Sequence, residues 1–253
     1  MVKSDLSTRV YEGDPPLVVT VHGAMDRGKS FSLARRYLLK YEFLTYDRRG
    51  YGDSRKLDPP VAKGLEGHLS DLMQIIGSRK VVLVGHSYGG VIALTASSKF
   101  PRSVLSAVIY EAPMPWLDWW HQEGATPGTK VTQAPSPEEA VNGFMKTMLG
   151  DRWDQMSEKN RIDRLDEGPA LISDLSELRS GAPFNPKDIA IPVTVGYGAK
   201  SSPRHEKAAI YLGNTIPDSQ VIKFEKSGHG AHISHPREFA KLIQEGINRA
   251  TKP

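Results

Sequence analysis

The stretch VVLVGHSYGG, residues 81–90, carries most of the information about the architecture of this chain. Its first four residues are apolar and mostly β-branched, as in a strand that is buried on both faces. From Val91 onward, apolar residues recur at helical spacing. Ser87 therefore lies at a strand-to-helix turn, with glycine two residues before it and two residues after it. In this context the G-x-S-x-G pattern is typical of an exposed, nucleophilic serine.

Crowding explains the two glycines of this pattern. A turn this sharp holds its central residue in a strained conformation, and side chains at Gly85 and Gly89 would collide with the neighbouring strand and helix. The turn also leaves the backbone amide of Tyr88 free at the start of a helix, where partial positive charge gathers. The sequence thus predicts a serine hydroxyl beside a free amide donor.

Length and composition limit the classes of protein that fit. The 253 residues suffice for one α/β domain with an inserted subdomain. The net charge of +4 arises from 33 basic and 29 acidic residues that are interspersed, which argues against a nucleic-acid partner. The absence of cysteine excludes disulfides and thiolate chemistry. Because we find no signal-peptide core and no apolar run of membrane-spanning length, we expect a cytoplasmic protein.

Strand patterns alternate with helical patterns through most of the chain. Besides residues 81–84, strands are predicted at residues 8–13, 17–21, 43–46, 104–110, 191–195 and 220–224. Helices are predicted at residues 32–39, 65–76, 203–212 and about 236–250, and from Val91 onward after the turn at Ser87. This alternation favours βαβ units in a mostly parallel, doubly wound sheet, with the functional site at the carboxyl ends of the strands.

Residues 112–187 break the alternation, because they contain three helical patterns and no convincing strand. Ser136 and Glu139 form a capping-box pattern that opens the first helix, the second starts near Ser157, and the third begins at Pro169. A polar loop is predicted at 122–135. We therefore expect a core formed by residues 1–111 and 188–253, with residues 112–187 as a helical cap.

The chain resembles the α/β-hydrolase superfamily, in the branch with a helical cap between the sixth and seventh strands. Four motifs in the right order carry the resemblance: His22-Gly23-Ala24-Met25, the loop from Asp47 to Ser54, the elbow at Ser87, and Gly228-His229. The resemblance covers nearly the whole chain and implies neither a cofactor nor a metal. An aspartate nucleophile, as in epoxide hydrolases and dehalogenases of this fold, is excluded because the elbow holds serine.

His229 is the candidate general base. It follows the last strand between two glycines, and the order serine, acid, histidine is the one expected for this fold. The resemblance assigns the oxyanion hole to the backbone amides of Ala24 and Tyr88. His86 is expected to be a packed core histidine. His232 and His235 follow His229 at three-residue steps, but without the carboxylate or cysteine pattern of a metal site.

The acid of the triad departs from the commonest pattern of the superfamily. That pattern places an aspartate shortly after the seventh strand, where this chain reads Gly196-Tyr197-Gly198-Ala199-Lys200-Ser201. A minority of the superfamily places the acid after the sixth strand, where Glu111 stands. We predict that Glu111 orients His229. Two alternatives stay open: Glu111 caps the strand and pairs with a basic residue, or Glu206 or a cap carboxylate is the acid.

Tryptophans gather in the predicted cap. Trp116, Trp119, Trp120 and Trp153 either line an apolar substrate pocket or form the core of a small lid. We predict that the first three, together with Met25, contact substrate.

The expected activity is that of a serine hydrolase acting on a carboxylic ester, thioester or lactone of a small, mostly apolar molecule. Carbon–carbon bond hydrolysis, perhydrolysis and acyl transfer stay open with the same triad. A non-catalytic ligand receptor on the same fold is the alternative from another class, motivated by the missing aspartate. The sequence does not determine the substrate or the oligomeric state, so a homo-oligomer stays open.

Overall fold

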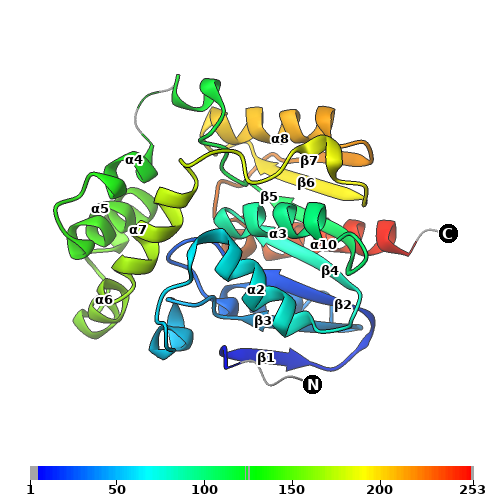
Figure 1. Ribbon diagram of the computed structural model, residues 1–253, viewed down its shortest axis with the longest axis horizontal. Helices are drawn as coiled ribbons and strands as arrows, with labels where there is room; N and C mark the ends of the chain where they lie inside the picture. The colour runs from blue at the N-terminus through cyan, green and yellow to red at the C-terminus, as the bar shows by residue number, and fades with distance from the viewer. Residues whose placement is uncertain (1–4, 123, 125, 252–253) are drawn as a thin grey trace.

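The computed structural model describes residues 5–122, 124 and 126–251, and Figure 1 shows a central sheet with helices on both of its faces. The seven strands run in the order β1-β3-β2-β4-β5-β6-β7. Only the β1–β3 pair is antiparallel in the described chain. The strands are β1 (Thr8–Tyr11), β2 (Asp14–Val21), β3 (Tyr41–Tyr46), β4 (Val81–His86), β5 (Val104–Tyr110), β6 (Val193–Gly198) and β7 (Ser219–Phe224). The predicted doubly wound, mostly parallel sheet is confirmed.

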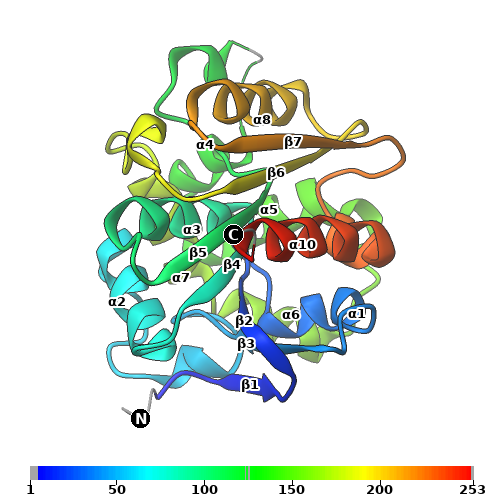
Figure 2. The ribbon, with the colours of Figure 1, turned by 90° about the vertical axis from the view of Figure 1, so that its right-hand side faces the viewer.

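Helices cover both faces of the sheet (Figure 2), and an apolar cluster lies on each face. The first contains α2 (Gly64–Ile76), α3 (Tyr88–Lys99) and α8 (Pro203–Thr215), and the second contains α1 (Ser32–Arg35), α9 (Ala231–Ser234) and α10 (Pro236–Ala250). The side chains of the central strand β4 alternate between the two apolar clusters. Its residues Val81 and Leu83 pack in the first cluster, whereas Val82 and Val84 pack in the second. This period of two explains why the strand is apolar throughout.

The segment between β5 and β6 is helical, and its main helices lie together at the left of Figure 1. They are α4 (Pro127–Thr132), α5 (Pro137–Leu149), α6 (Glu158–Leu165) and α7 (Gly168–Glu177). Residues of α4, α5 and α7 share an apolar cluster with Met25 and Tyr51 of the sheet domain. The insertion therefore has its own core, and this core continues into the domain beneath it.

Three of these helices begin where the sequence predicts, two of them with a capping serine. The Ser136 side chain accepts a hydrogen bond from the amide of Glu139 (3.2 Å), and Ser157 caps α6 in the same way through Asn160 (3.4 Å). α7 carries proline in its first turn. The reciprocal bond from the Glu139 side chain is missing among the described contacts, so only half of the predicted capping box forms.

Two expectations about local structure are wrong. The predicted polar loop at 122–135 contains α4, because Thr126 and Thr129 form a capping box around a first-turn proline and Val131 is buried in the insertion core. Positions 123 and 125 of that loop lie outside the described residues. The helix predicted at 32–39 ends at Arg35, where tighter bonds from Tyr37 and Leu38 turn the chain.

Short 3₁₀ segments complete the secondary structure. They are η1 (Gly28–Phe31), η2 (Gly52–Lys56), η3 (Asp118–His121), η4 (Gly150–Arg152) and η5 (Pro186–Asp188). Within the described ranges, no helix combines the length and the apolar character needed to cross a membrane.

Candidate active site

Ser87 occupies the turn between β4 and α3 in a strained conformation, with φ 54° and ψ −127°. Its amide donates to the carbonyl of Tyr110 on the neighbouring strand (2.9 Å). A Cβ at Gly85 would lie 2.5 Å from the carbonyl oxygen of Gly89, and one at Gly89 would lie 2.0 Å from that of Val21. Close approach therefore requires both glycines, as the sequence pattern predicts.

The loop after β2 lies directly against Ser87. A Cβ added to Gly23 would come within 2.9 Å of the Cβ of Ser87, so only glycine allows this approach. The next residue, Ala24, donates no backbone hydrogen bond to a described residue. Tyr88 is the first residue of α3, where the amide has no partner within the helix. The amides of Ala24 and Tyr88, one after the loop glycine that approaches Ser87 and one next to Ser87 in sequence, thus have no described hydrogen-bond acceptor.

His229 and Glu111 form a hydrogen-bonded pair. The Nδ1 atom of His229 lies 2.6 Å from Oε2 of Glu111, which is buried just after β5. The other carboxylate oxygen accepts from the amide of Gly198 (2.8 Å) and the hydroxyl of Ser201 (2.5 Å). Burial opposes ionisation of Glu111, but the hydrogen bond and the charge of His229 outweigh it. The pKa of Glu111 is therefore lowered. The carboxylate is therefore ionised and aimed at the imidazole.

Ser201 stands in the segment after β6, where the commonest superfamily pattern has its aspartate. Its hydroxyl points at the carboxylate of Glu111 instead. Glu206, the other candidate acid, lies in the first turn of α8 and accepts a hydrogen bond from the hydroxyl of Tyr197 (2.9 Å). Of these two glutamates, the structure brings Glu111 to His229.

His86 connects the loop of His229 to the elbow. Its Nε2 donates to the backbone carbonyl of His229 (2.8 Å), and the two imidazole rings lie 4.7 Å apart. No described hydrogen bond joins the Ser87 hydroxyl to His229 itself; such bonds are often long in unliganded enzymes. His86 is buried, as the sequence analysis expects, and burial together with the neighbouring His232 holds its pKa well below the usual range.

His205 is a neighbour of the pair that the sequence does not predict. It lies in α8, and its ring stacks on that of His229 at 4.8 Å and 23°. Trp120 contacts the other side of His205 edge-on at 5.6 Å. Burial and the adjacent His229 lower the pKa of His205 to about 3, so it is neutral at physiological pH. Its sequence context, PRHEK, gives no motif that would identify it.

Buried neutral histidines give the protein an expected sensitivity to acid. Burial lowers the pKa of His22 and of His205 from 6.5 to about 3. As the pH falls below 6.5, the unfolded chain takes up these protons first, so stability present above that pH is lost. Each histidine should reduce the free energy of unfolding by about 1.4 kcal/mol per pH unit. Urea unfolding between pH 7 and 4 measures the slope; His205→Asn should flatten it, and an unchanged slope would contradict this account.

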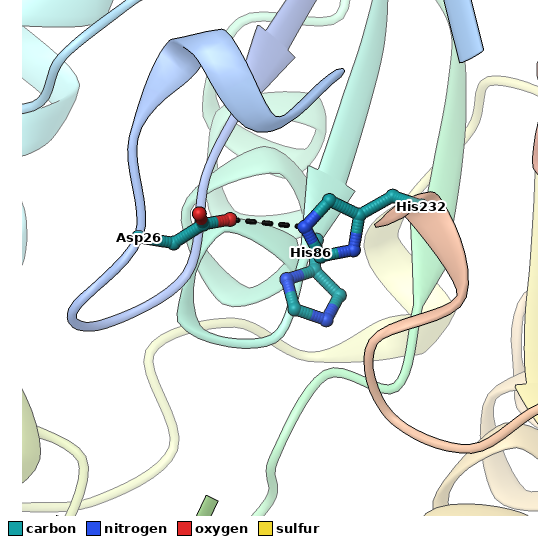
Figure 3. A group of neighbouring side chains, drawn as sticks. All are labelled: Asp26, His86 and His232. Carbon is teal, nitrogen blue, oxygen red and sulfur yellow. Dashed lines mark hydrogen bonds and ion pairs between the residues drawn. The ribbon is translucent and has the colours of Figure 1, made fainter. Parts of the chain in front are cut away.

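A second polar cluster lies behind the elbow (Figure 3). His232 bonds to the carboxylate of Asp26 (3.1 Å), and its ring lies 4.2 Å from that of His86. The donor atoms of these three residues lie within 4.8 Å of one another, as do those of a second group formed by Glu111, His205 and His229. Among the residues that the structure describes, these two groups have the geometry to hold a metal ion. Unlike His232, His235 joins neither group.

The tryptophans separate into two places. Trp116 packs edge-on against Phe184, whereas Trp119 packs against Trp120 and Tyr211 on the face that α8 covers. Trp153 lies apart from them, buried in the insertion core. Met25 is also buried in the insertion core, with 5% of its surface exposed. Of the four substrate-contact candidates, Trp120 is connected to the His229–Glu111 pair by ring contacts through His205.

Comparisons with known proteins agree with this architecture. The family model described as "Alpha/beta hydrolase family" matches residues 18–242. "Epoxide hydrolase 4" of Homo sapiens is 28% identical over 111 residues, which cover 41% of this chain and only 30% of that protein. "sn-1-specific diacylglycerol lipase ABHD11" of Mus musculus is 22% identical over 94% of this chain and 83% of its own length.

Solved structures share the fold. The "Esterase (EaEST) from Exiguobacterium antarcticum" superposes with a TM-score of 0.76 at 21% identity, covering 96% of this chain and 95% of that one. "MenH from S. aureus" gives a TM-score of 0.74 at 17% identity, covering 97% and 99%. The predicted α/β-hydrolase fold is thereby confirmed. The match of the family model over most of the chain, on a sheet of this topology, shows that the chain belongs to the alpha/beta hydrolase family.

Proposed function

We propose that the chain is a serine hydrolase that cleaves a carboxylic ester, thioester or lactone of a small, mostly apolar molecule. The observation that carries this proposal is the buried Glu111 carboxylate bonded at 2.6 Å to His229, whose backbone carbonyl bonds to His86, the residue before Ser87 and its strained turn. This arrangement supplies an oriented base next to a hydroxyl that the backbone holds in place.

The proposed reaction proceeds through an acyl-enzyme. The Oγ atom of Ser87 attacks the carbonyl carbon while Nε2 of His229 takes the hydroxyl proton, and Glu111 stabilises the imidazolium that results. The amides of Ala24 and Tyr88 bind the oxygen that becomes negative. Collapse of the tetrahedral intermediate expels the alcohol or thiol, which receives the proton from His229. Water then attacks the acyl group by the same route and releases the acid and free Ser87.

Several neighbouring activities use the same groups. Carbon–carbon bond hydrolysis, perhydrolysis and acyl transfer differ in the leaving group or in the acceptor, and a non-catalytic receptor would bind a ligand without reaction. The two unpartnered amides favour an enzyme, because a receptor has no need of donors aimed at a developing charge.

A fluorophosphonate probe and a panel of aryl esters test the proposal together. We expect covalent labelling of the protein, and turnover of aryl esters that varies with acyl length from acetyl to long chains. Matched anilides serve as the control for a simple leaving-group effect. A protein that neither labels nor turns over any ester would contradict the proposal and favour the receptor.

We further propose that residues 112–187 act as a lid over the core formed by residues 1–111 and 188–253, and that Trp116, Trp119 and Trp120 line the acyl pocket. The helical character of the insertion and its own apolar core support this division.

Replacing Trp119 with alanine should shift the preferred acyl length more than it changes the melting temperature. Trp119 is only partly buried and packs on the edge of the core, so its removal opens space at little cost in stability. Profiles of kcat/KM over the ester panel provide the measurement. Trp153→Phe, in the insertion core, is the control and should leave the profile unchanged. A lower melting temperature with an unchanged profile would make Trp119 a packing residue only.

A further inference from the structure

Arg48 is buried with no exposed surface, directly behind the loop that carries Ala24. Its Nε donates to the carbonyl of His22 (2.9 Å), and its Nη2 donates to the carbonyl of Gly23 (3.2 Å). The carbonyl of Gly23 and the amide of Ala24 belong to one planar peptide group. Whatever holds that carbonyl therefore also sets the direction of the Ala24 N–H.

His22 reinforces the same peptide group. Its Nδ1 donates to the Gly23 carbonyl (2.7 Å), and its Nε2 accepts from the backbone amide of Arg48 (2.8 Å). Burial, followed by the charge of Arg48, lowers the pKa of His22 to about 3, which keeps the imidazole neutral. The neutral ring has one donor and one acceptor, and both are used.

The guanidinium of Arg48 also packs against the side chain of Tyr88, the residue whose backbone amide is proposed as the other donor of the oxyanion hole. It lies 4.9 Å from the ring centre of Tyr88 on one side and 4.7 Å from that of Tyr51 on the other. Tyr88 supplies the second free amide from the start of α3. One buried cation thus contacts both segments that present a free amide to Ser87.

The counter-ion of Arg48 comes from the insertion. Asp174 of α7 is buried, and its Oδ2 accepts from Nη2 of Arg48 (2.8 Å) and from the hydroxyl of Tyr51 (2.7 Å). Its Oδ1 lies 2.9 Å from Nε2 of His68. Burial alone would disfavour the carboxylate, but Arg48 and His68 hold the pKa of Asp174 well below its usual range.

We propose that Arg48 and Asp174 are positioning residues that couple the docking of α7 to the alignment of the oxyanion hole. The inference rests on the proposed function. With α7 in place, Asp174 fixes the guanidinium, the guanidinium fixes the Gly23–Ala24 peptide and braces Tyr88, and both amides point at the reacting oxygen. Without Asp174, an unpaired guanidinium in this site would turn toward solvent and release the two carbonyls.

A purely structural ion pair would behave differently. Well-packed apolar residues hold buried helices as firmly as an ion pair does, so holding α7 requires no charge here. A structural role predicts a lower melting temperature and no selective loss of transition-state binding. A positioning role predicts a loss in kcat that is matched by weaker binding of an analogue carrying an oxyanion.

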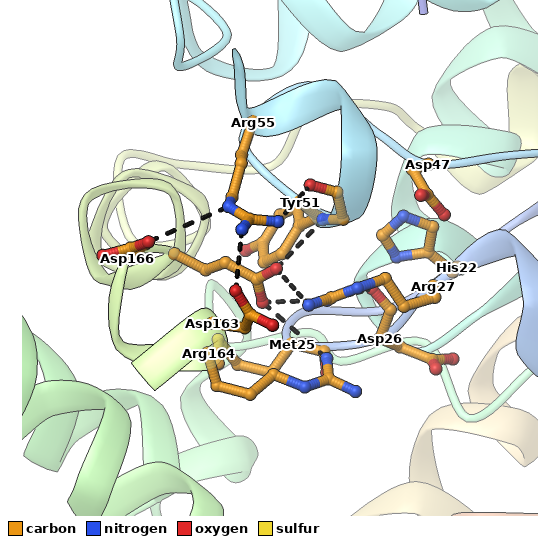
Figure 4. Close-up of polar contacts among 12 residues, drawn as sticks. His22, Met25, Asp26, Arg27, Asp47, Tyr51, Arg55, Asp163, Arg164 and Asp166 are labelled. Carbon is orange, nitrogen blue, oxygen red and sulfur yellow. Dashed lines mark hydrogen bonds and ion pairs between the residues drawn. The ribbon is translucent and has the colours of Figure 1, made fainter. Parts of the chain in front are cut away.

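The chain offers a matched control for this comparison (Figure 4). Arg55 of the η2 segment pairs with Asp163 of α6 (2.9 Å), so it too joins the sheet domain to the insertion. This pair is partly exposed, and Arg55 also contacts the carbonyl of Gly52 (2.9 Å) and the carboxylate of Asp166 (3.9 Å). Asp163→Asn therefore loosens the insertion without touching the peptide of Ala24.

The test compares Asp174→Asn, Arg48→Lys and the double variant Arg48→Met/Asp174→Leu with Asp163→Asn. The double variant removes the ion pair without leaving a lone buried charge, so it should stay folded. For each variant we measure melting temperature, kcat and KM on an aryl ester, inhibition by an aryl trifluoromethyl ketone and binding of the product acid. The hydroxyl of Ser87 adds to the carbonyl of the ketone and creates an oxyanion, whereas the product acid binds without such an addition.

We expect kcat to fall by about ten- to a hundredfold in the three variants of the ion pair, somewhat less than the loss of a whole oxyanion donor. Inhibition by the ketone should weaken by the same factor, whereas KM and acid binding should change less than about threefold. Asp163→Asn should leave both kcat and inhibition by the ketone unchanged. Wild-type kcat in a folded double variant would overturn the inference, as would equal losses in Asp163→Asn, or failure of all three variants to fold. A wild-type protein that does not react with esters would overturn the proposed function as well.

Discussion

Ser87→Ala should reduce ester turnover by at least about 10⁴-fold and abolish fluorophosphonate labelling, because the variant lacks the proposed nucleophilic hydroxyl at the strained turn. The fold should survive, since the Ser87 side chain makes no described hydrogen bond. Steady-state kinetics and gel fluorescence measure both effects, and circular dichroism checks the fold.

An exposed serine elsewhere in the chain provides the control. Ser180→Ala removes a hydroxyl near the end of α7 and should leave turnover and labelling unchanged. If Ser87→Ala kept more than a tenth of wild-type activity on every ester, Ser87 would not be the nucleophile.

Glu111→Gln should reduce turnover by about 10³- to 10⁴-fold. Glutamine has almost the same shape, but it lacks the charge that stabilises the His229 imidazolium and no longer fixes the tautomer of the ring. It also faces two donors, the Gly198 amide and the Ser201 hydroxyl, which the carboxylate now satisfies. Glu206→Gln is the control, since Glu206 bonds to Tyr197 instead, and it should be nearly silent.

Ser201→Asp in the Glu111→Gln background should restore part of the activity. The hydroxyl of Ser201 lies 2.5 Å from the carboxylate of Glu111, so aspartate at 201 brings a carboxylate to the commoner acid position. The same substitution in the wild-type chain should impair activity, because two carboxylates would crowd one imidazole. Near-normal turnover of Glu111→Gln alone would disprove the assignment, whatever the second change did.

The sequence predicts the elements of this fold well where the pattern is strong and local. β5 has the predicted bounds, and so does the closing helix α10, whose long amphipathic period makes it easy to recognise. α4 and the short α1 are mispredicted because capping by Thr126 and packing of the chain after Arg35 decide those segments. Helices of one or two turns give too few residues for a period to emerge.

The residues of the candidate site also differ in how well the sequence predicts them. Ser87 and His229 stand in short motifs with glycines beside them, and each motif constrains its own backbone. Glu111 is predicted only from the alternative acid position of the superfamily, after the sixth strand. Its bond to His229 is a tertiary contact between residues 118 positions apart. Arg48 lies in the Asp47–Ser54 loop motif, which does not specify its partners, and His205 carries no local motif. Their partners Asp174 and His229 are brought to them by the fold, so the sequence alone cannot predict these contacts.

The most direct measurement of the central claim is rapid acid quenching of the protein during turnover of an aryl ester, followed by peptide mapping. The account predicts a burst of aryl alcohol, about one per active site, and an acyl group on the peptide that contains Ser87. Ser87→Ala should show neither. Steady turnover by the wild type with no burst, and an unmodified Ser87 peptide even when a slowly deacylating carbamate replaces the ester, would contradict an acyl-enzyme on Ser87.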